Sequence, residues 1–321
     1  MKKVLIVLGP TGAGKTSASI EIAKHLDTEI ISSDSMQIYK HMDIGTAKPT
    51  VQQRGEVVHH MIDILEPWES FSAGEYIKAV KPIIKSLHKR RKIPVIVGGT
   101  GLYIKAMTRG IFKGPSADWD LREELLSKEH SQKGFLYSRL KELDPSAASR
   151  IMLEDTRRII RALEVCLKTG SAITDQQKML THPLPYKFIK IGITRDREEL
   201  YKIIDERVDE MMRQGLVDEV KNVIRLITES RIDAIGEKEN SYLFLRQFSS
   251  MQAIGYKEIA MYLSGEISLE NAINLVKQRS RNYAKRQFTW FKKEENIQWI
   301  NLTGRNEESG TIQFARILNA L

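Results

Sequence analysis

The stretch VLIVLGPTGAGKT at residues 4–16 decides the fold class of this chain. Residues 4–8 form an unbroken apolar run, the pattern of a strand buried on both faces of a parallel sheet. Residues 17–26 follow in helical period, so the order is strand, glycine-rich turn, helix. The turn matches the pattern G-x-x-x-x-G-K-[ST] in full, with Gly9, Pro10, Thr11, Gly12, Ala13, Gly14, Lys15 and Thr16.

Each residue type in this turn suits a phosphate ligand. The glycines let backbone N–H groups turn inward around a phosphate, Lys15 places a positive charge against the terminal phosphates, and the Thr16 hydroxyl can ligate Mg²⁺. The helix that follows adds its positive N-terminal end. A chance glycine turn is the alternative, but the strand before it and the helix after it favour a P-loop. We therefore predict that residues 9–16 bind a diphosphate or nucleotide, with Mg²⁺ on Thr16.

Strands and helices alternate along much of the chain. Strands are predicted at residues 4–8, 29–32, 60–65, 95–97 and 188–194. Helices are predicted at residues 17–26, 73–92, 197–227 and 269–293. This alternation predicts an α/β fold with a doubly wound parallel sheet.

One internal segment differs from the rest. Residues 117–181 are polar and helical, with no convincing strand. We expect a helical insertion domain over 115–185, mounted on a P-loop core made of residues 1–114 and 186–321. The polar stretch at 229–240 predicts a loop in that core.

Composition sets limits on the class of protein. Lys and Arg number 50 against 41 Asp and Glu, giving a net charge of +9, which suits a polyanionic partner or a merely soluble basic enzyme. The single cysteine, Cys166, excludes an intramolecular disulfide and a cysteine-type zinc cluster. The apolar run near the N-terminus is too short for a signal peptide, and no run approaches a membrane span. We expect a cytoplasmic protein without a membrane partner.

Polar residues follow several predicted strands. Asp34 and Ser35, with Gln37, follow the strand at 29–32, and Thr100 follows the strand at 95–97. Ligands of doubly wound sheets bind at the carboxyl ends of strands, so we expect Lys15, Asp34 and Thr100 to converge. Asp34 could ligate a metal, act as a general base, or merely cap the segment after its strand.

Two further observations limit the reactions and the metal sites to be expected. The strand at 95–97 ends in Gly-Gly-Thr without the carboxylate that motor and switch NTPases place there, which favours a small group-transfer enzyme. His59 and His60 lie near Asp63, but adjacent residues in an extended segment point to opposite faces. A structural role for this pair is therefore favoured over metal ligation.

The helix predicted at 269–293 carries an apolar stripe with basic flanks. No acidic residue occurs between Lys277 and Lys293, and such a surface fits a phosphate backbone, although a solvated charged face is the alternative. The basic residues are Lys277, Arg281, Lys285 and Lys292 on one flank and Arg279, Arg286 and Lys293 on the other. A second cluster lies at 155–161, where Arg157 and Arg161 share a helix face and Glu154 and Glu164 could pair with them.

Taken together, these motifs closely resemble those of the bacterial tRNA dimethylallyltransferase family. The resemblance runs from about residue 4 to residue 299. Besides the phosphate loop, it rests on DSMQIY at 34–39, MDIGTAKP at 42–49, HH at 59–60, GGT at 98–100 with LY at 102–103, RALEV at 161–165, and AKRQ at 284–287 with TW at 289–290.

The resemblance implies a reaction and its site. The acceptor would be adenosine 37 in the anticodon stem-loop of tRNA, and the donor would be dimethylallyl diphosphate, with Mg²⁺. It implies catalytic roles for Asp34 as general base, Thr100 near the scissile bond, and Lys15 and Arg207 at the diphosphate. We expect a monomer. The implied tRNA contacts are Asp34, Ser35, Met36, Gln37, Thr100, Arg122, Arg157, Arg158, Ile159, Ile160, Arg161, Lys277, Arg281, Lys285 and Arg286.

Three other functions use the same features. A P-loop kinase of a nucleoside or small metabolite would need the phosphate loop and could use Asp34 as base. A related enzyme prenylates free AMP. An ATP-regulated RNA-binding protein would need the loop and the basic helix without chemistry. One result distinguishes prenylation of tRNA from all three alternatives: the transfer of label from dimethylallyl diphosphate to tRNA.

Overall fold

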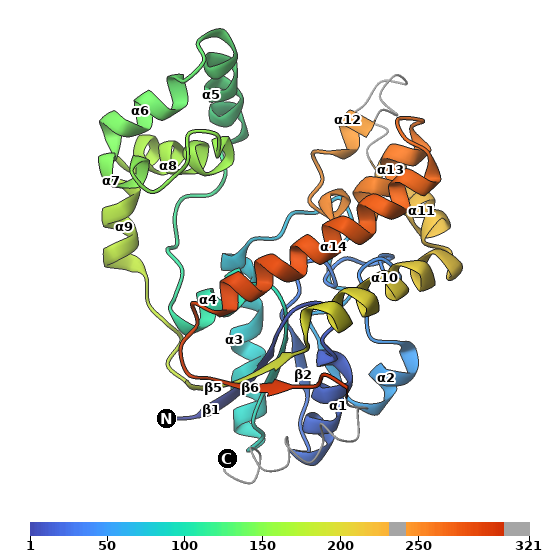
Figure 1. Ribbon diagram of the computed structural model, residues 1–321. Helices are drawn as coiled ribbons and strands as arrows, with labels where there is room; N and C mark the ends of the chain where they lie inside the picture. The colour runs from blue at the N-terminus through green and yellow to red at the C-terminus, as the bar shows by residue number, and fades with distance from the viewer. Residues whose placement is uncertain (231–241, 305–321) are drawn as a thin grey trace. The chain divides into compact units, whose positions relative to one another are not determined.

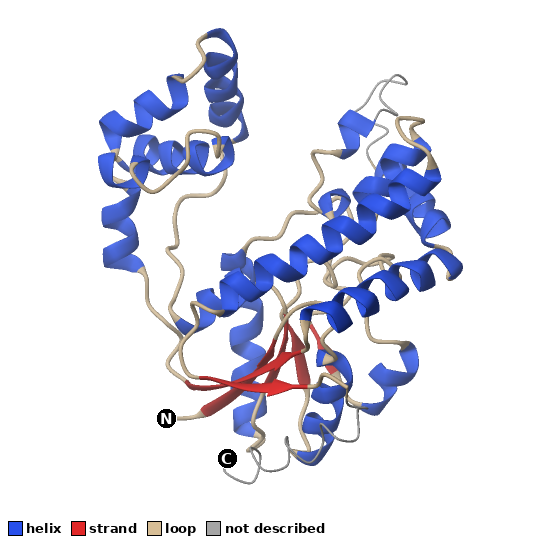
Figure 2. Cartoon of the chain, in the orientation of Figure 1, coloured by secondary structure: helices blue, strands red, loops and turns tan. Residues whose placement is uncertain are grey.

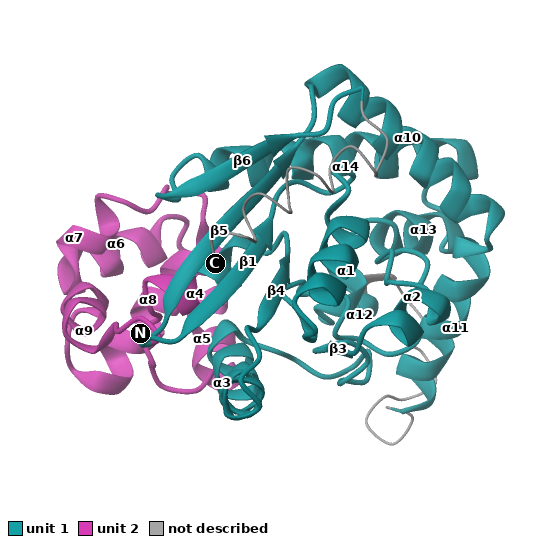
Figure 3. Ribbon diagram, turned by 90° about the horizontal axis from the view of Figure 1, so that it is seen from below, with its two compact units in different colours: residues 1–104, 185–321 teal, residues 105–184 magenta. Residues whose placement is uncertain are grey.

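The structure, a computed structural model, describes residues 1–230 and 242–304. Most of the loop predicted at 229–240 and the end of the predicted core, 305–321, lie outside the described residues. The chain divides into two compact units, one made of residues 1–104 and 185–321 and the other of residues 105–184 (Figure 3). No described helix has the length and hydropathy that crossing a bilayer requires.

The first unit is built on a six-stranded sheet in which every neighbouring pair is parallel, in the order β3-β2-β4-β1-β5-β6 (Figures 1 and 2). The connection from β1 to β2 runs in one direction along the sheet and the connection back to β4 runs in the other. Right-handed crossovers therefore place the two intervening helices, α1 and α3, on opposite faces (Figure 3). The doubly wound parallel sheet predicted from the sequence is confirmed. The strands are β1 (Lys3–Leu8), β2 (Ile30–Ser32), β3 (His59–His60), β4 (Val95–Gly98), β5 (Lys187–Thr194) and β6 (Ile297–Asn301).

Local signals in the sequence set the ends of the helices in this unit. Ser72 and Glu75 form a capping box at the start of α3, and the Ser268 side chain caps α14. Gly215, with φ of 96°, ends the first half of the helix predicted at 197–227, which is therefore two helices, α10 and α11. The helices are α1 (Lys15–His25), α2 (Val51–Glu56), α3 (Ala73–Lys89), α4 (Gly101–Thr108), α10 (Arg197–Arg213), α11 (Leu216–Glu229), α12 (Tyr242–Leu245), α13 (Tyr256–Leu263) and α14 (Leu269–Phe291), with a 3₁₀ turn at Ser250–Gln252.

Two strands differ from the prediction. The strand expected at 60–65 ends after His60 because Met61 and Asp63 have positive φ angles of 64° and 55°, which turn the chain out of the sheet. The edge strand β6 was not predicted. Its pattern is weak because Gln298, Trp299 and Asn301 are exposed and only Ile300 is fully buried.

The second unit is entirely helical within its described residues (Figure 2). The division falls after Ile104, earlier than the predicted boundary at 114, because Phe112 packs on the core of this unit and the backbone of Leu184 donates to that of Met107. Its own core includes Leu125, Leu140 and Leu163. The helices are α5 (Trp119–Ser131), α6 (Phe135–Leu143), α7 (Pro145–Ala148), α8 (Thr156–Thr169) and α9 (Ile173–Leu180).

Glu164 on α8 ties this unit together. Its side chain is completely buried and accepts hydrogen bonds from the Arg122 guanidinium at 2.9 Å, from the Asp118 backbone N–H at 2.7 Å, and from Arg161. Burial opposes ionisation of Glu164, but Arg122 and the other donors hold its pKa below the ordinary value. A carboxylate thus joins the start of α5 to the middle of α8.

We expect Glu164→Ala to destabilise the second unit by about 2 kcal/mol. This lies below the roughly 3–5 kcal/mol typical of a broken buried pair because the two arginines can turn toward solvent. Urea unfolding followed by circular dichroism measures the change. Glu142→Ala is the matched control, since Glu142 pairs with Arg139 on the surface and such pairs contribute about 0–1 kcal/mol. Equal midpoints for the two variants would contradict the role of Glu164.

Candidate active site

The turn after β1 has the backbone shape of a phosphate loop. Gly9 has φ of 150°, and a Cβ there would lie 2.2 Å from the carbonyl oxygen of Ile193, so only glycine fits this close approach to β5. Gly14 precedes α1 in a left-handed conformation, and the helix begins at Lys15. The Lys15 ammonium donates to the Pro10 carbonyl at 2.7 Å, so the side chain lies over the turn.

A single amide from α14 joins this turn to the turn after β4. Oε1 of Gln287 accepts from the Thr11 backbone N–H at 2.8 Å, and Nε2 donates to the Gly99 carbonyl at 2.9 Å. A Cβ on Gly99 would lie 2.1 Å from Nε2, so any larger residue there would displace the amide from this position. From the sequence, Gln287 was identified only as part of the motif AKRQ at 284–287, with no role. Its place among apolar residues on the buried face of α14 is the signal that could have found it.

The turn after β2 is fixed to the turn after β4 in a similar way. The Thr100 hydroxyl oxygen accepts from the Ser35 backbone N–H at 3.0 Å. Oδ1 of Asp34 accepts from the Met36 N–H at 2.9 Å, so the capping role considered from the sequence is present at one carboxylate oxygen. Asp34 also lines the cavity between these turns. The local cap uses only one carboxylate oxygen, so the second oxygen can bind a ligand or accept a proton.

The turns surround a cavity of about 470 Å³, which is within the range of ligand pockets. All its lining residues belong to the first unit. Six predicted site residues lie in the turns that shape the cavity without lining it: Gly9, Pro10, Ala13, Ser35, Met36 and Thr100. The predicted site residues that line the cavity are Thr11, Gly12, Gly14, Lys15, Thr16, Asp34, Gln37 and Arg207.

The cavity is positively charged on the side of the phosphate loop. Burial lowers the pKa of Lys15 to about 8; the Asp34 carboxylate acts against this shift and Arg207 adds to it. Nη1 of Arg207, on α10, donates to the Thr11 hydroxyl at 3.4 Å. An anion that enters would therefore meet an ammonium, a guanidinium and the N-terminal end of α1 together.

Two further lining residues were missed by the sequence analysis. Arg195 directly follows β5, where its guanidinium donates to the Leu302 carbonyl at 2.9 Å. The rule that singled out Asp34 at the end of β2 applies equally to Arg195 and could have found it. Tyr283 on α14 also lines the cavity, and burial, followed by the nearby Asp34 charge, raises the pKa of its hydroxyl, so it stays a hydrogen-bond donor.

The residues present fit a magnesium ion bound together with a diphosphate. Thr16 and Asp34 supply oxygen atoms, and Mg²⁺ commonly takes one or two protein ligands and completes its shell with phosphate oxygens and water. The part of the chain that the structure describes holds no cluster of three or more His, Cys, Asp or Glu side chains suited to a metal. His59 bonds to the Val57 carbonyl and His60 to Glu29, which agrees with the structural role expected for the pair.

The loop at 42–49 forms another wall of the cavity, with lining residues from Thr46 to Pro49. Glu219 on α11 holds its first part by accepting from the backbone N–H groups of Asp43, Ile44 and Gly45 at 2.8, 2.8 and 3.0 Å. This wall is therefore positioned by a carboxylate that lies outside the cavity.

Lys48 also fixes the loop at 42–49. Its buried ammonium donates to Asp43, to Asp63 and to the Tyr39 carbonyl at 2.7, 2.5 and 2.6 Å. The Gln37 amide donates to the carbonyls of Thr46 and Ala47 at 3.4 and 3.3 Å. The predicted RNA-contacting residue Gln37 thus also has a structural partner in this loop.

The basic flanks of α14 are more balanced than the sequence indicated. Lys277 pairs with Asp209 at 2.6 Å, Arg281 pairs with both oxygens of Asp205, and Arg279 pairs with the buried Glu258. The acidic partners come from α10 and α13, so the absence of acids between Lys277 and Lys293 was misleading. Lys285 and Arg286 are exposed, and neither forms an ion pair within the described residues.

The predicted RNA contacts in the second unit fall into two groups. Ile159 and Ile160 are buried in its helical core, and Arg122 is bound to Glu164, so these three side chains serve packing. Arg157 and Arg158 are exposed on α8, and Arg161 is half-buried. Of the predicted contacts, it is this second group that an RNA partner could reach.

The sequence of residues 37–294 matches the profile of the IPP transferase family. The chain belongs to this family. It is 56% identical over 306 residues, covering 95% of this chain and 94% of the relative, to the tRNA dimethylallyltransferase of Thermodesulfovibrio yellowstonii. It is 45% identical over 301 residues, with 94% and 93% covered, to the protein of the same name from Thermotoga maritima.

Solved structures of IPP transferase relatives agree with this assignment. The full-length tRNA isopentenylpyrophosphate transferase of Bacillus halodurans superposes with a TM-score of 0.71 at 39% identity, covering 100% of this chain and 96% of that one. A eukaryotic dimethylallyltransferase acting on tRNA superposes with a TM-score of 0.80 at 28% identity, covering 100% of this chain and 80% of that one.

The lowered pKa of Lys15 predicts a pH dependence of diphosphate binding. Below pH 8 Lys15 is charged and binds the anion, and above it the charge is lost in the free protein, so affinity should fall as pH rises through about 8. Titration with inorganic diphosphate and Mg²⁺ across this pH range measures the effect. Lys15→Arg is the control, because an arginine stays charged and should remove the inflection. An inflection that persists in Lys15→Arg would assign it to another group.

Proposed function

We propose that this chain transfers a dimethylallyl group from dimethylallyl diphosphate to the N6 amine of adenosine 37 in tRNA. The observation that carries the proposal is the meeting of a phosphate-binding turn and a carboxylate, Lys15 and Asp34, on one cavity. The relatives of this chain bear names for this same activity. The protein acts as a monomer in the cytoplasm, where its substrates are.

The phosphate loop binds the donor by its diphosphate. Backbone N–H groups of Gly12 and of residues 14–16, together with the Lys15 ammonium, would donate to the phosphate oxygens, and Arg207 approaches from α10. Mg²⁺ held by Thr16 and the diphosphate would neutralise charge on the leaving group. Because negative charge builds on the diphosphate as the carbon–oxygen bond breaks, these groups stabilise the transition state more than the ground state.

The acceptor is an adenine amine, which is a weak nucleophile because its lone pair is delocalised into the ring. As the nitrogen forms its bond to the dimethylallyl carbon, the Asp34 carboxylate takes one proton from the amine and the diphosphate leaves. A positioned base of this kind contributes roughly 10²–10⁴-fold. Thr100, which follows the neighbouring strand β4, fixes the turn that carries Asp34. In this proposal Thr100 acts near the bond that breaks.

The tRNA reaches this site with its target base out of the stack. Extrusion costs a few kcal/mol and least for a loop nucleotide. Lys285 and Arg286 on α14 and the exposed arginines of α8 supply contacts to the RNA backbone. Neither a small-metabolite kinase nor an AMP prenyltransferase needs such surfaces, and this favours tRNA as the acceptor.

The direct test is transfer of label. The chain is incubated with unmodified tRNA, labelled dimethylallyl diphosphate and Mg²⁺, and in parallel with AMP as acceptor or with labelled ATP as donor. Label in tRNA from dimethylallyl diphosphate alone supports the proposal. Label in AMP, or transfer of phosphate from ATP, would replace it by one of the two rival enzymes.

Asp34→Asn should keep tRNA binding and lower kcat by about 10²–10⁴-fold, the range for the removal of a general base. An asparagine oxygen can still accept from the Met36 N–H, so the turn should keep its shape. Asp27→Asn is the matched control, because Asp27 is exposed and lies outside the cavity. A kcat for Asp34→Asn within twofold of that of the control would remove the base assignment.

Neutralising basic residues on α14 provides a second test. Replacing Lys285 and Arg286 together by Gln should weaken tRNA binding and reduce the slope of log K against log salt by roughly 0.7–0.9 for each phosphate that is no longer bound. Replacing Lys277 and Arg281 together removes the same charge but should change the slope less, since Asp209 and Asp205 already neutralise them. Equal slopes for the two double variants would mean that Lys285 and Arg286 are solvated and do not contact the RNA.

A further inference from the structure

The second unit has a pocket of its own that the reaction described above does not use. Its volume is about 290 Å³, near the lower edge of the ~300–1,000 Å³ typical of ligand pockets. The wall is apolar and made by Ala147, Ile151, Ala162 and Ile173 from the core of this unit. A site of this size and lining can take one small apolar group.

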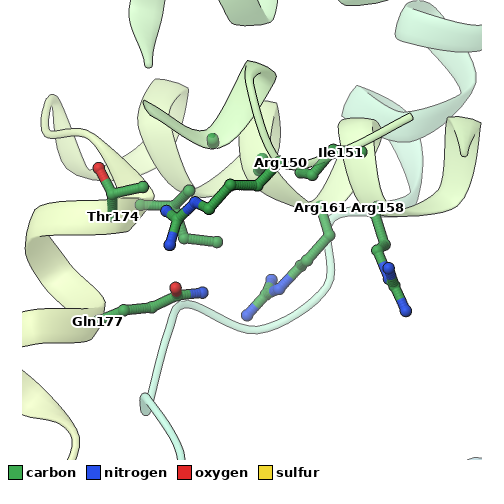
Figure 4. A pocket seen from close by; sticks show the side chains of 9 residues that line it. Arg150, Ile151, Arg158, Arg161, Thr174 and Gln177 are labelled. Carbon is green, nitrogen blue, oxygen red and sulfur yellow. The ribbon is translucent and has the colours of Figure 1, made fainter. Parts of the chain in front are cut away.

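The charged side chains at this pocket are all arginines, and Gln177 is a polar neighbour. Arg150 and Arg161 reach toward Gln177, and Arg158 lies beyond Arg161 (Figure 4). Among the described residues, no Asp or Glu lines the pocket. Two carboxylates outside the lining, Glu164 and Asp155, pair with Arg161 and Arg158. Three arginines against two carboxylates leave a net positive charge beside the pocket, which favours an anionic ligand.

The arginines keep donors free for such a ligand. Nε of Arg150 donates to the Ser146 carbonyl at 2.9 Å, and Arg150 forms no ion pair within the described residues. Arg158 is 70% exposed and has only a long contact of 3.4 Å with Asp155. Arg161 is held by the buried Glu164, which fixes its position at the rim.

An unpaired nucleotide combines an apolar base face with a nearby anionic phosphate, the two features that this lining would bind. Unpaired bases of RNA are commonly stacked on guanidinium planes and read by hydrogen bonds to their edges. The Gln177 amide has both a donor and an acceptor, as such reading requires. A free phosphate would use the arginines but would have no use for the apolar wall.

We propose that this pocket binds one unpaired nucleotide of the tRNA, with its base against the apolar wall beside Arg150 and Gln177 and its phosphate near Arg158. The inference rests on the proposed function, because it takes tRNA as the partner. The nucleotide is not the reacting adenosine, whose amine must reach Asp34 in the cavity of the first unit. The pocket is thus a second, non-reacting base site that contributes to the choice of tRNA.

The test is a thermodynamic cycle between the pocket and the RNA bases. Binding of the full chain is measured to anticodon stem-loop hairpins in which each unpaired nucleotide is in turn made abasic, without donor so that no turnover occurs. The pocket variant is Arg150→Gln with Gln177→Ala. The control is Arg139→Gln with Gln132→Ala, which makes the same substitutions at exposed positions of the same unit away from the pocket.

One abasic position other than adenosine 37 should weaken binding to the wild type about tenfold. This loss should persist in the control and shrink to less than about twofold in the pocket variant, because base and pocket act as a coupled pair. Gln177→Glu, a second variant at an exposed residue, should also shrink this loss, because a carboxylate lacks the N–H donors with which the amide would bind the base edge. Circular dichroism checks that all variants are folded.

Equal abasic losses in wild type and pocket variants at every position would overturn the proposal. So would a uniform fall in affinity for all hairpins with unchanged abasic losses, because the pocket would then contact only backbone phosphate. Labelled prenyl transfer to tRNA by the wild type is measured separately. Failure of that transfer counts against the proposed function, whereas intact transfer with equal abasic losses counts against the pocket alone.

Discussion

The two hydrogen bonds of the Gln287 side chain are the interaction on which the site depends most. One amide holds the Thr11 N–H of the phosphate turn and the Gly99 carbonyl of the neighbouring turn at 2.8 and 2.9 Å. The bond to the Gly99 carbonyl is buried, and a buried group left without its partner costs about 1–3 kcal/mol. The amide therefore fixes the spacing of the two turns and the depth at which α14 lies over them.

The other parts of the cavity follow from the parallel sheet. The carboxyl ends of β1, β2, β4 and β5 meet at one edge, so Lys15, Asp34, Thr100 and Arg195 come together from distant parts of the sequence. Thr100 joins two of these ends by its bond to Ser35. Outside the sheet, one carboxylate, Glu219, fixes the remaining wall by holding three successive backbone N–H groups. A rigid frame of this kind suits a reaction that depends on positioned charge.

How much of this the sequence predicts depends on how local the signal is. The signals for the phosphate loop and for the parallel sheet lie in short runs of consecutive residues, and both were predicted. Gln287 could not be placed, since its partner Thr11 lies 276 residues away and nothing local marks the pairing. The charge of α14 was misjudged for the same reason, because Asp205 and Asp209 lie on another helix. The strand β6 was missed because Gln298 and Trp299 are both exposed, so the alternation of buried and exposed residues that marks a strand is broken.

The most direct measurement is the affinity of Gln287→Met for dimethylallyl diphosphate with Mg²⁺, by titration calorimetry. Methionine keeps the length of the side chain but can neither accept from Thr11 nor donate to Gly99. Gln278→Met, at an exposed position of the same helix, is the control. Our account predicts at least about tenfold weaker binding for Gln287→Met, corresponding to the two missing hydrogen bonds, with the control unchanged. Affinity within twofold of wild type, in a variant that remains folded, would contradict it.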